Sequence, residues 1–243
     1  AIVSIGVSLK PIGANDNANT TTNAQVLIPV IDNDPGKSGS MLVAGTDPLH
    51  GTVLINGDGT IMYTPNAGYS GRDSFTYKLK NSSNVESDPI TVTISVKPAG
   101  SMDQATTYTG DPTTVVLKNN DLSKTGTTVI INTNPTNGTI AVDALGSVIY
   151  SPAAGFSGKD SFTYNLRTTD GIDSDPIVVN INVRPIGTID YTSTPINTLV
   201  NIPVKDNDLS KIGTNVVIAT NPAHGTVSVN TSNITTYIPN PGF

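Results

Sequence analysis

Residues 70–77 read Ser-Gly-Arg-Asp-Ser-Phe-Thr-Tyr, and residues 157–164 read Ser-Gly-Lys-Asp-Ser-Phe-Thr-Tyr, 87 positions later. The similarity extends well beyond this octapeptide. Aligned without gaps, residues 11–97 and 98–184 are identical at 34 of 87 positions. A fixed period of this length is the signature of a tandem array of domains, so the period determines how the chain is divided.

The 87-residue period predicts two complete repeats and two partial ones. We expect the first repeat at 11–97 and the second at 98–184. Residues 1–10 match the end of a repeat and predict the last strand of a preceding one. Residues 185–243 match the first 59 positions and predict a truncated third repeat. We expect the native polypeptide to continue in both directions.

Within each repeat the hydrophobic period is two. Residues 90–96 read Ile-Thr-Val-Thr-Ile-Ser-Val, residues 75–79 read Phe-Thr-Tyr-Lys-Leu, and both patterns return 87 positions later. Such alternation is typical of half-buried strands, and turn-forming Asn, Asp, Gly and Pro separate the runs. No stretch of ten residues has helical spacing. The sequence therefore predicts an all-β chain of tandem immunoglobulin-like antiparallel β-sandwiches, with an up-and-down barrel as the alternative.

Composition excludes several kinds of protein. The net charge is −6, from 13 basic and 19 acidic residues, so a basic groove for nucleic acid is not expected. The chain has no cysteine, which excludes disulfides, thiolate metal sites and a cysteine nucleophile. It has no run of 18 apolar residues, so we expect no membrane span.

The order of motifs resembles that of a known family. An Asn-Asp pair is followed by Pro-x-x-Gly-Thr, Gly-x-x-x-Tyr-x-Pro, the octapeptide and an alternating final strand. In the first repeat these positions are Asn33, Asp34, Pro48, Gly51, Thr52, Gly59, Tyr63, Pro65, Gly68, Tyr69, Ser70, Gly71, Asp73, Phe75 and Tyr77. This order is similar to that of bacterial cadherin-like, Ig-like tandem domains, and the likeness covers essentially the whole chain. It implies large secreted or surface-attached proteins, including adhesins and gliding-motility adhesins.

The resemblance also raises the question of calcium, which such domains often bind at acidic loops and domain junctions. The candidate ligands at the junctions recur 87 positions apart and are Asp16, Asp103 and Asp190. The loop after each Asn-Asp pair, however, holds a lysine in the same register: Lys37, Lys124 and Lys211. An ammonium group repels a calcium ion. We therefore expect no cofactor, and calcium at the three aspartates is the alternative.

Two further residue pairs allow a functional and a structural interpretation. Asp73 and Asp160 each lie two residues after a glycine and precede the Phe-Thr-Tyr strand. They predict turn-locking acceptors, with an exposed metal or ligand carboxylate as the alternative. Tyr77 and Tyr164 predict core side chains whose hydroxyls bond to backbone, with ligand stacking as the alternative.

No catalytic constellation is expected. His50 and His224 occupy one repeat position, and Asn137 occupies it in the second repeat, which indicates a turn residue and not a general base. The chain lacks a nucleophile elbow, a phosphate loop and a dinucleotide motif. We predict that the chain is not an enzyme.

These observations predict a structural role. We expect stalk or spacer domains of a large bacterial cell-surface adhesin, extracellular, joined by short proline-containing linkers into a semi-rigid rod that projects a binding tip. The expected partners are neighbouring repeats of the same longer chain, and a surface glycan or protein. The alternatives are a multivalent array that itself binds glycan or protein, and a non-catalytic spacer in a secreted multidomain enzyme.

Overall fold

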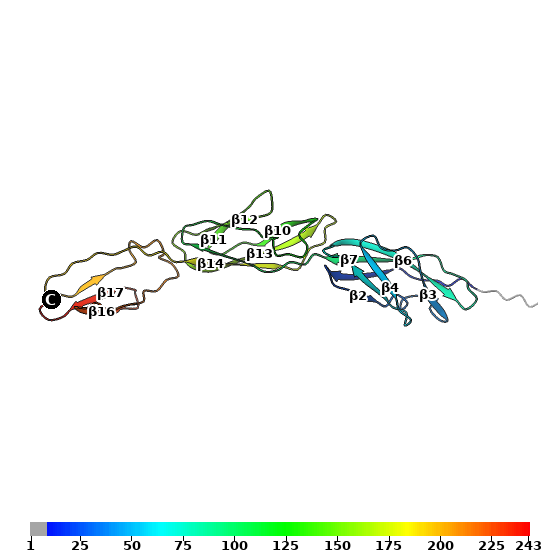
Figure 1. Ribbon diagram of the computed structural model, residues 1–243, viewed down its shortest axis with the longest axis horizontal. Coiled ribbons are helices and arrows are strands. Elements are labelled where there is room, and N and C mark those ends of the chain that lie inside the picture. The colour runs from blue at the N-terminus through cyan, green and yellow to red at the C-terminus, as the bar shows by residue number, and fades with distance from the viewer. Residues whose placement is uncertain (1–8) are drawn as a thin grey trace, which may run out of the picture. The chain divides into compact units, whose positions relative to one another are not determined.

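The computed structural model describes residues 9–243, and Figure 1 draws the strands along the chain from blue to red. Within that range the regular elements are all strands. This confirms the all-β class. The strand predicted within residues 1–10 lies outside the described residues, except for residues 9 and 10, which are not in a strand.

The first repeat contains seven strands in two sheets. The strands are β1 (Asp16–Thr21), β2 (Val26–Ile28), β3 (Ser40–Ala44), β4 (Gly51–Ile55), β5 (Ile61–Pro65), β6 (Gly71–Asn81) and β7 (Ile90–Lys97). One sheet has the order β1-β7-β6-β3 and the other β2-β5-β4. Two sheets of this kind form the predicted sandwich, because each strand turns alternate side chains toward the space between them.

The second repeat has the same topology. Its strands are β8 (Asp103–Tyr108), β9 (Thr113–Val115), β10 (Thr127–Thr133), β11 (Gly138–Val142), β12 (Val148–Pro152), β13 (Gly158–Thr168) and β14 (Ile177–Arg184). The sheets have the orders β10-β13-β14-β8 and β11-β12-β9, and the paired strands β11 and β12 lie side by side in Figure 1.

One pairing departs from the expected antiparallel arrangement. β1 runs parallel to β7, with Asp16 opposite Val92, and β8 runs parallel to β14, with Asp103 opposite Val179. A parallel pair needs a long crossover, and in the first repeat nearly the whole domain lies between β1 and β7. Alternation within a strand indicates which face is buried and carries no information about the direction of its partner.

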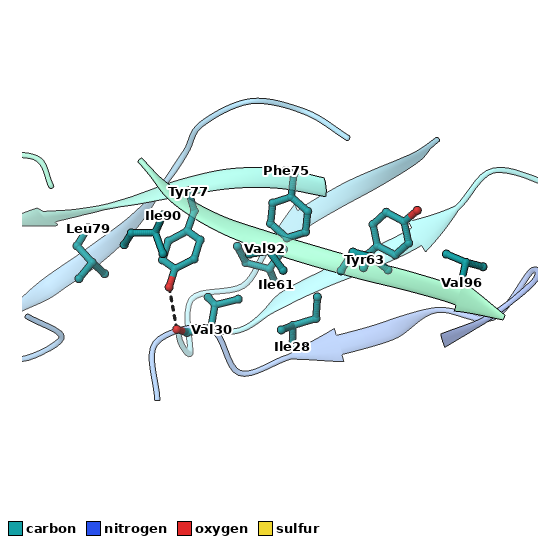
Figure 2. Packing of buried hydrophobic residues seen from close by; sticks show 11 residues of the cluster. Ile28, Val30, Ile61, Tyr63, Phe75, Tyr77, Leu79, Ile90, Val92 and Val96 are labelled. Carbon is teal, nitrogen blue, oxygen red and sulfur yellow. Dashed lines mark hydrogen bonds between the residues drawn. The ribbon is translucent and has the colours of Figure 1, made fainter. Parts of the chain in front are cut away.

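The core of the first repeat consists of the alternating side chains that the sequence indicated (Figure 2). Every second residue of β7 is buried, and β6 contributes Phe75, Tyr77 and Leu79. β2 and β5 supply Ile28, Ile61 and Tyr63 from the opposite sheet. Burial of each such side chain stabilises the fold by about 1.5–3 kcal/mol. In the second repeat Val178, the one residue that breaks the alternation, is 39% exposed.

The third repeat has one sheet among its described strands. β15 (Val200–Ile202), β16 (Gly225–Val229) and β17 (Thr235–Pro239) form it in the order β15-β17-β16. These strands correspond to β2, β4 and β5, 174 positions earlier. The segments that correspond to β1 and β3, residues 190–195 and 214–218, are not strands.

The chain divides into two compact units that do not coincide with the repeats. One contains the described residues up to 101 together with 118–131 and 164–177. The other contains 102–117, 132–163 and 178–243. Each unit therefore includes the contacts on both sides of one boundary between repeats.

Candidate functional site

The first polar cluster surrounds the hydroxyl of Tyr77, a side chain that β6 contributes to the core. Tyr77 is fully buried, and its hydroxyl lies 2.8 Å from the carbonyl oxygen of Val30, as the dashed line in Figure 2 shows. The same hydroxyl lies 2.9 Å from Oδ2 of Asp34 and 3.1 Å from Oδ2 of Asp16. The prediction that this tyrosine is a core residue bonded to backbone is confirmed.

The cluster contains more acceptors than one hydroxyl can serve. A tyrosine hydroxyl has one proton, but its oxygen also accepts hydrogen bonds. The acceptor oxygens therefore need a second proton, which one of the two carboxyl groups carries. Burial, reinforced by the charge of Asp34 and opposed by hydrogen bonds from Tyr77 and Asn33, raises the pKa of the Asp16 carboxyl to about 6. Asp16 is therefore the group that holds this proton in mildly acidic solution.

The second repeat carries a matching cluster. The hydroxyl of Tyr164 donates a hydrogen bond to Oδ2 of Asp121 at 3.0 Å, and Oδ1 of Asp121 accepts from the backbone N–H of Ser101 at 2.7 Å. Burial raises the pKa of the Asp121 carboxyl above its ordinary value, although both hydrogen bonds favour the ionised form. Asp103 is also buried.

The three calcium candidates occupy different surroundings. Asp16 and Asp103 are buried on β1 and β8, whereas Asp190 is exposed in a loop. Within residues 9–243, no three His, Cys, Asp or Glu side chains are grouped as a metal site would require. The expectation of no cofactor, with calcium at these residues as the alternative, stays a prediction.

The lysine of the Asn-Asp loop has a structural contact. Nζ of Lys37 donates a hydrogen bond to the carbonyl oxygen of Asp32 at 2.7 Å, and Nζ of Lys211 donates to Asp206 at the same distance. The ammonium group closes the loop on its own backbone. From the sequence, this lysine was considered only as a charge that repels a calcium ion.

A second cluster is centred on Asp73. Its Oδ1 accepts from the backbone N–H of Leu49 at 3.1 Å, and its Oδ2 accepts from the N–H of His50 at 3.0 Å and from the hydroxyl of Tyr63 at 2.9 Å. Asp73 is buried, and the carboxylate fastens the loop before β4 to β6. The interpretation of Asp73 as a turn-locking acceptor is confirmed.

The contacts of Asp160 in the second repeat are the same. Asp160 accepts from Thr136 N–H at 3.0 Å, from Asn137 N–H at 2.9 Å and from the hydroxyl of Tyr150 at 2.9 Å. These distances reproduce those of Asp73 within 0.1 Å. Only backbone N–H groups of the loop take part, which explains why His50 is replaced by Asn137 without loss of the contact.

The glycine of the Pro-x-x-Gly motif is required because the ring of a tyrosine packs against its Cα. A Cβ atom on Gly51 would lie 2.5 Å from Cε2 of Tyr63, and one on Gly138 would lie 2.5 Å from Cε2 of Tyr150. Any side chain at this position would displace the tyrosine whose hydroxyl reaches the carboxylate.

Sequence reasoning missed a hydroxyl pair at the boundary between repeats. Oγ1 of Thr22 and Oγ of Ser123 lie 2.7 Å apart, and both side chains are buried. Ser123 Oγ accepts from the backbone N–H of Ala99 at 2.9 Å, and the N–H of Thr22 donates to the carbonyl oxygen of Lys97 at 2.9 Å. The end of β7 is thereby tied to the first loops of the following repeat.

The pair recurs one period later. Ser210 Oγ donates to Oγ1 of Thr109 at 2.7 Å and accepts from the backbone N–H of Ile186, while the N–H of Thr109 donates to the carbonyl oxygen of Arg184 at 3.0 Å. Thr109 is fully buried and Ser210 is 3% exposed. We call Thr22–Ser123 and Thr109–Ser210 the junction hydroxyl pairs. The 87-residue spacing between the two threonines, and between the two serines, is the sequence feature from which the pairs could have been predicted.

Charged contacts near the boundaries lie at the surface. Nζ of Lys97 lies 2.8 Å from Oδ1 of Asp175, and both side chains are well exposed. Ion pairs of this kind contribute about 0–1 kcal/mol. The carboxylate of Asp170 accepts from the backbone N–H of Arg72 at 2.7 Å, and a hydrogen bond from Thr168 lowers the pKa of Asp170.

The repeated sandwiches, with their buried tyrosine–aspartate clusters, match a known domain family. The bacterial Ig domain family matches residues 9–95 and 96–182, and the chain belongs to this family. This confirms the predicted resemblance and fold class. Among curated proteins, none matches the chain significantly. No helix in the described residues is long and apolar enough to cross a membrane.

Several solved structures are similar at low identity. An I-band fragment of titin is 8% identical, with 96% of this chain and 89% of that chain covered and a TM-score of 0.32. The D00–D0 domain of intimin is 14% identical, with 69% and 98% covered and a TM-score of 0.30.

An endo-fucoidan hydrolase of glycoside hydrolase family 107 is 16% identical, with a TM-score of 0.28. The alignment covers 96% of this chain, which spans only 40% of the hydrolase. Likenesses at this level have no bearing on activity or ligand.

Proposed function

We propose that the chain is a spacer: a run of stalk domains in a large bacterial cell-surface adhesin that holds a binding tip away from the cell. The observation that carries this proposal is the repetition of the junction hydroxyl pairs. The same buried contact, at 2.7 Å both times, joins the turn after the first strand of one repeat to the Asn-Asp loop of the next. Like contacts at successive boundaries suit a spacer, because in a tandem array each repeat contacts only its neighbours.

The chemistry of the buried carboxylates supports the same proposal. Asp34, Asp73 and Asp160 bond to backbone N–H groups and to tyrosine hydroxyls of their own repeat. Such use of a carboxylate is structural, because the group that would have to bind substrate already holds a loop in place. We therefore propose that these residues carry no catalytic activity.

Location on the cell surface is part of the proposal. It is supported by membership of a family of bacterial Ig domains. An antibody against this chain, applied to intact cells that produce the parent protein, should label them without permeabilisation. Labelling that appears only after lysis would contradict the proposal.

A further inference from the structure

The first repeat has an open groove beside the edge strands of its two sheets. β3 is the last strand of one sheet, and β4 is the last strand of the other. The groove has a volume of about 500 Å³ and is lined by β3, the end of β4 and the turn that follows it. Ile31, Leu42, Ile55 and Asp58 are among the lining residues. Aliphatic side chains and one carboxylate therefore border the same space, which we call the β3–β4 groove.

In the other two repeats a lysine occupies the register position of Ile31. The counterparts are Lys118 and Lys205, and both are half-buried. Nζ of Lys118 donates a hydrogen bond to the carbonyl oxygen of Thr127 at 2.6 Å. Nζ of Lys205 donates to the carbonyl oxygen of Thr214 at 2.8 Å. The second and third repeats therefore each supply an ammonium group of their own to the same backbone carbonyl.

The first repeat has this carbonyl without the lysine. Ser40 stands at the position of the two threonines, and it lines the groove. Asn81, which lies opposite Ser40 in the ladder, donates its N–H to the carbonyl oxygen of Val85. Opposite residues of an antiparallel pair exchange both hydrogen bonds or neither, so the carbonyl group of Ser40 is turned toward the open edge of the sheet. The side chain of Ile31 has no donor to offer it.

The first repeat also has a carboxylate at a position where the other two have none. Asp58, in the turn between β4 and β5, aligns with Leu145 and Ser232. Its Oδ1 accepts hydrogen bonds from the hydroxyl of Thr60 at 2.7 Å and from the backbone N–H of Thr60 at 3.1 Å. The bond from the hydroxyl, reinforced by the backbone bond, lowers the pKa of the Asp58 carboxyl, so the group is ionised at neutral pH. Both bonds engage Oδ1, which leaves Oδ2 for a further donor.

We propose that the β3–β4 groove binds a lysine side chain of a partner polypeptide. The aliphatic stem of this lysine lies along Leu42 and Ile55. Its ammonium group donates to the carboxylate of Asp58 and to the carbonyl oxygen of Ser40, which an ammonium can do at once because it has three donors. The site goes beyond the spacer role, because it gives the first repeat a ligand that the second and third repeats do not bind.

A lysine fits this groove better than other side chains do. An apolar side chain would cover the aliphatic wall and leave the carboxylate and the carbonyl oxygen without a donor. Lysine combines a stem that packs on apolar surface with a charged end that stays near water. The net charge of −6 adds a long-range attraction for a cationic partner. The strongest argument is internal, since the other two repeats place a lysine at this position themselves.

A lysine analogue tests the proposal on the full chain. N-acetyl-lysine methylamide, titrated into isotope-labelled protein, should shift the amide resonances of residues 40–42 and 56–59 with a single saturable affinity in the millimolar range. The corresponding resonances of the second repeat, residues 127–129 and 143–146, should not move. The norleucine analogue has a similar stem without the ammonium group, and it should bind about tenfold more weakly.

Three variants of the chain locate the site. Ile31→Lys copies the other repeats and should fill the groove from within, so that binding is lost and the thermal midpoint does not fall. Asp58→Asn keeps an Oδ1 acceptor for Thr60 and removes the charge, and it should weaken binding of the lysine analogue about tenfold. Asp47→Asn removes an exposed carboxylate that does not line the groove. It is the matched control and should leave the affinity unchanged.

Equal binding of the lysine and norleucine analogues would overturn the proposal, and so would an Asp58→Asn variant that binds as tightly as the Asp47→Asn control. Shifts confined to residues outside the groove would overturn it as well. Resonances of the groove that shift with protein concentration alone would show a second copy as the occupant and would also overturn it. None of these outcomes affects the spacer proposal, because stalk domains need no lysine site.

Discussion

The hydroxyl of Tyr77 lies 3.1 Å from Oδ2 of Asp16, and this buried contact joins two residues 61 positions apart in the sequence. Asp34 and the carbonyl of Val30 share the same hydroxyl. The cluster is at its most favourable when one carboxyl is protonated, and Asp16 is the group whose pKa is raised to about 6.

The first prediction concerns pH. The folded state holds the Asp16 proton more tightly than the unfolded chain, in which the pKa is near 3.8. The stability from this group is therefore complete below about pH 4 and is lost as pH rises through about 6. Thermal melts should show the midpoint of the first repeat falling by about 5 °C between pH 4 and 7.

The variant Asp16→Asn should remove most of this slope, and the exposed Asp47→Asn should leave it intact. Asp170 and Asp173, whose pKa values are lowered by hydrogen bonds from Thr168 and Arg167, lose their contributions below pH 4, outside the window. A midpoint that rises steadily from pH 4 to 7 would contradict the assignment.

The second prediction concerns the loop acceptor. Asp73→Ala leaves three backbone N–H groups and the hydroxyl of Tyr63 without their shared acceptor. We expect a loss of about 3 kcal/mol in the free energy of unfolding, measured by urea titration. Asp160→Ala should cost the second repeat a similar amount, because its contacts are the same. A cost below about 0.5 kcal/mol at either site would disagree with the structure.

The third prediction concerns the junction hydroxyl pairs. Thr22→Val and Ser123→Ala each remove one hydroxyl from a buried contact with little change of shape. A double-mutant cycle should give a coupling of about 0.5–1.5 kcal/mol. A cycle on Thr22 and Ser210, which belong to different pairs, serves as the control and should give none. Equal coupling in both cycles would refute a direct contact.

The fourth prediction concerns calcium. Lys37 and Lys211 close their loops through backbone carbonyls, and Asp16 lies against the hydroxyl of Tyr77, so the core needs no ion. Melts followed by circular dichroism should have the same midpoint in calcium and in EDTA. A rise of many degrees in calcium would show binding to the folded state by linkage and would restore Asp16, Asp103 and Asp190 as ligands.

Much of the fold was predictable because its signals are local and repeated. The alternation along β6 and β7, and the octapeptide that begins β6, identify the buried strands and the core position of Tyr77. That Asp73 is a structural acceptor was predictable from its repeated place at the start of the octapeptide strand, whereas its partners, Leu49 and His50, lie 24 and 23 residues away and carry no local signal.

Other features depend on contacts that no local pattern records. The parallel pairing of β1 with β7 joins the two ends of the repeat. The alternation of apolar and polar residues does not indicate which strands pair. Ser123 aligns with a glycine in the first repeat, so this serine recurs in only two of the three repeats. Its contact with Thr22 was therefore hard to predict from the repeat pattern. Asp16 was a candidate calcium ligand because the sequence shows that it recurs every 87 residues. The sequence does not show that its side chain is buried.

The most direct test of the spacer proposal is single-molecule pulling of the full chain. If each repeat is an independent unit of equal length, unfolding should occur in steps, with at least two steps that each release about 30 nm of extended chain. Thr22→Val with Ser123→Ala should leave the step length unchanged. A single event that releases the whole chain, or steps of unrelated length, would contradict the proposal.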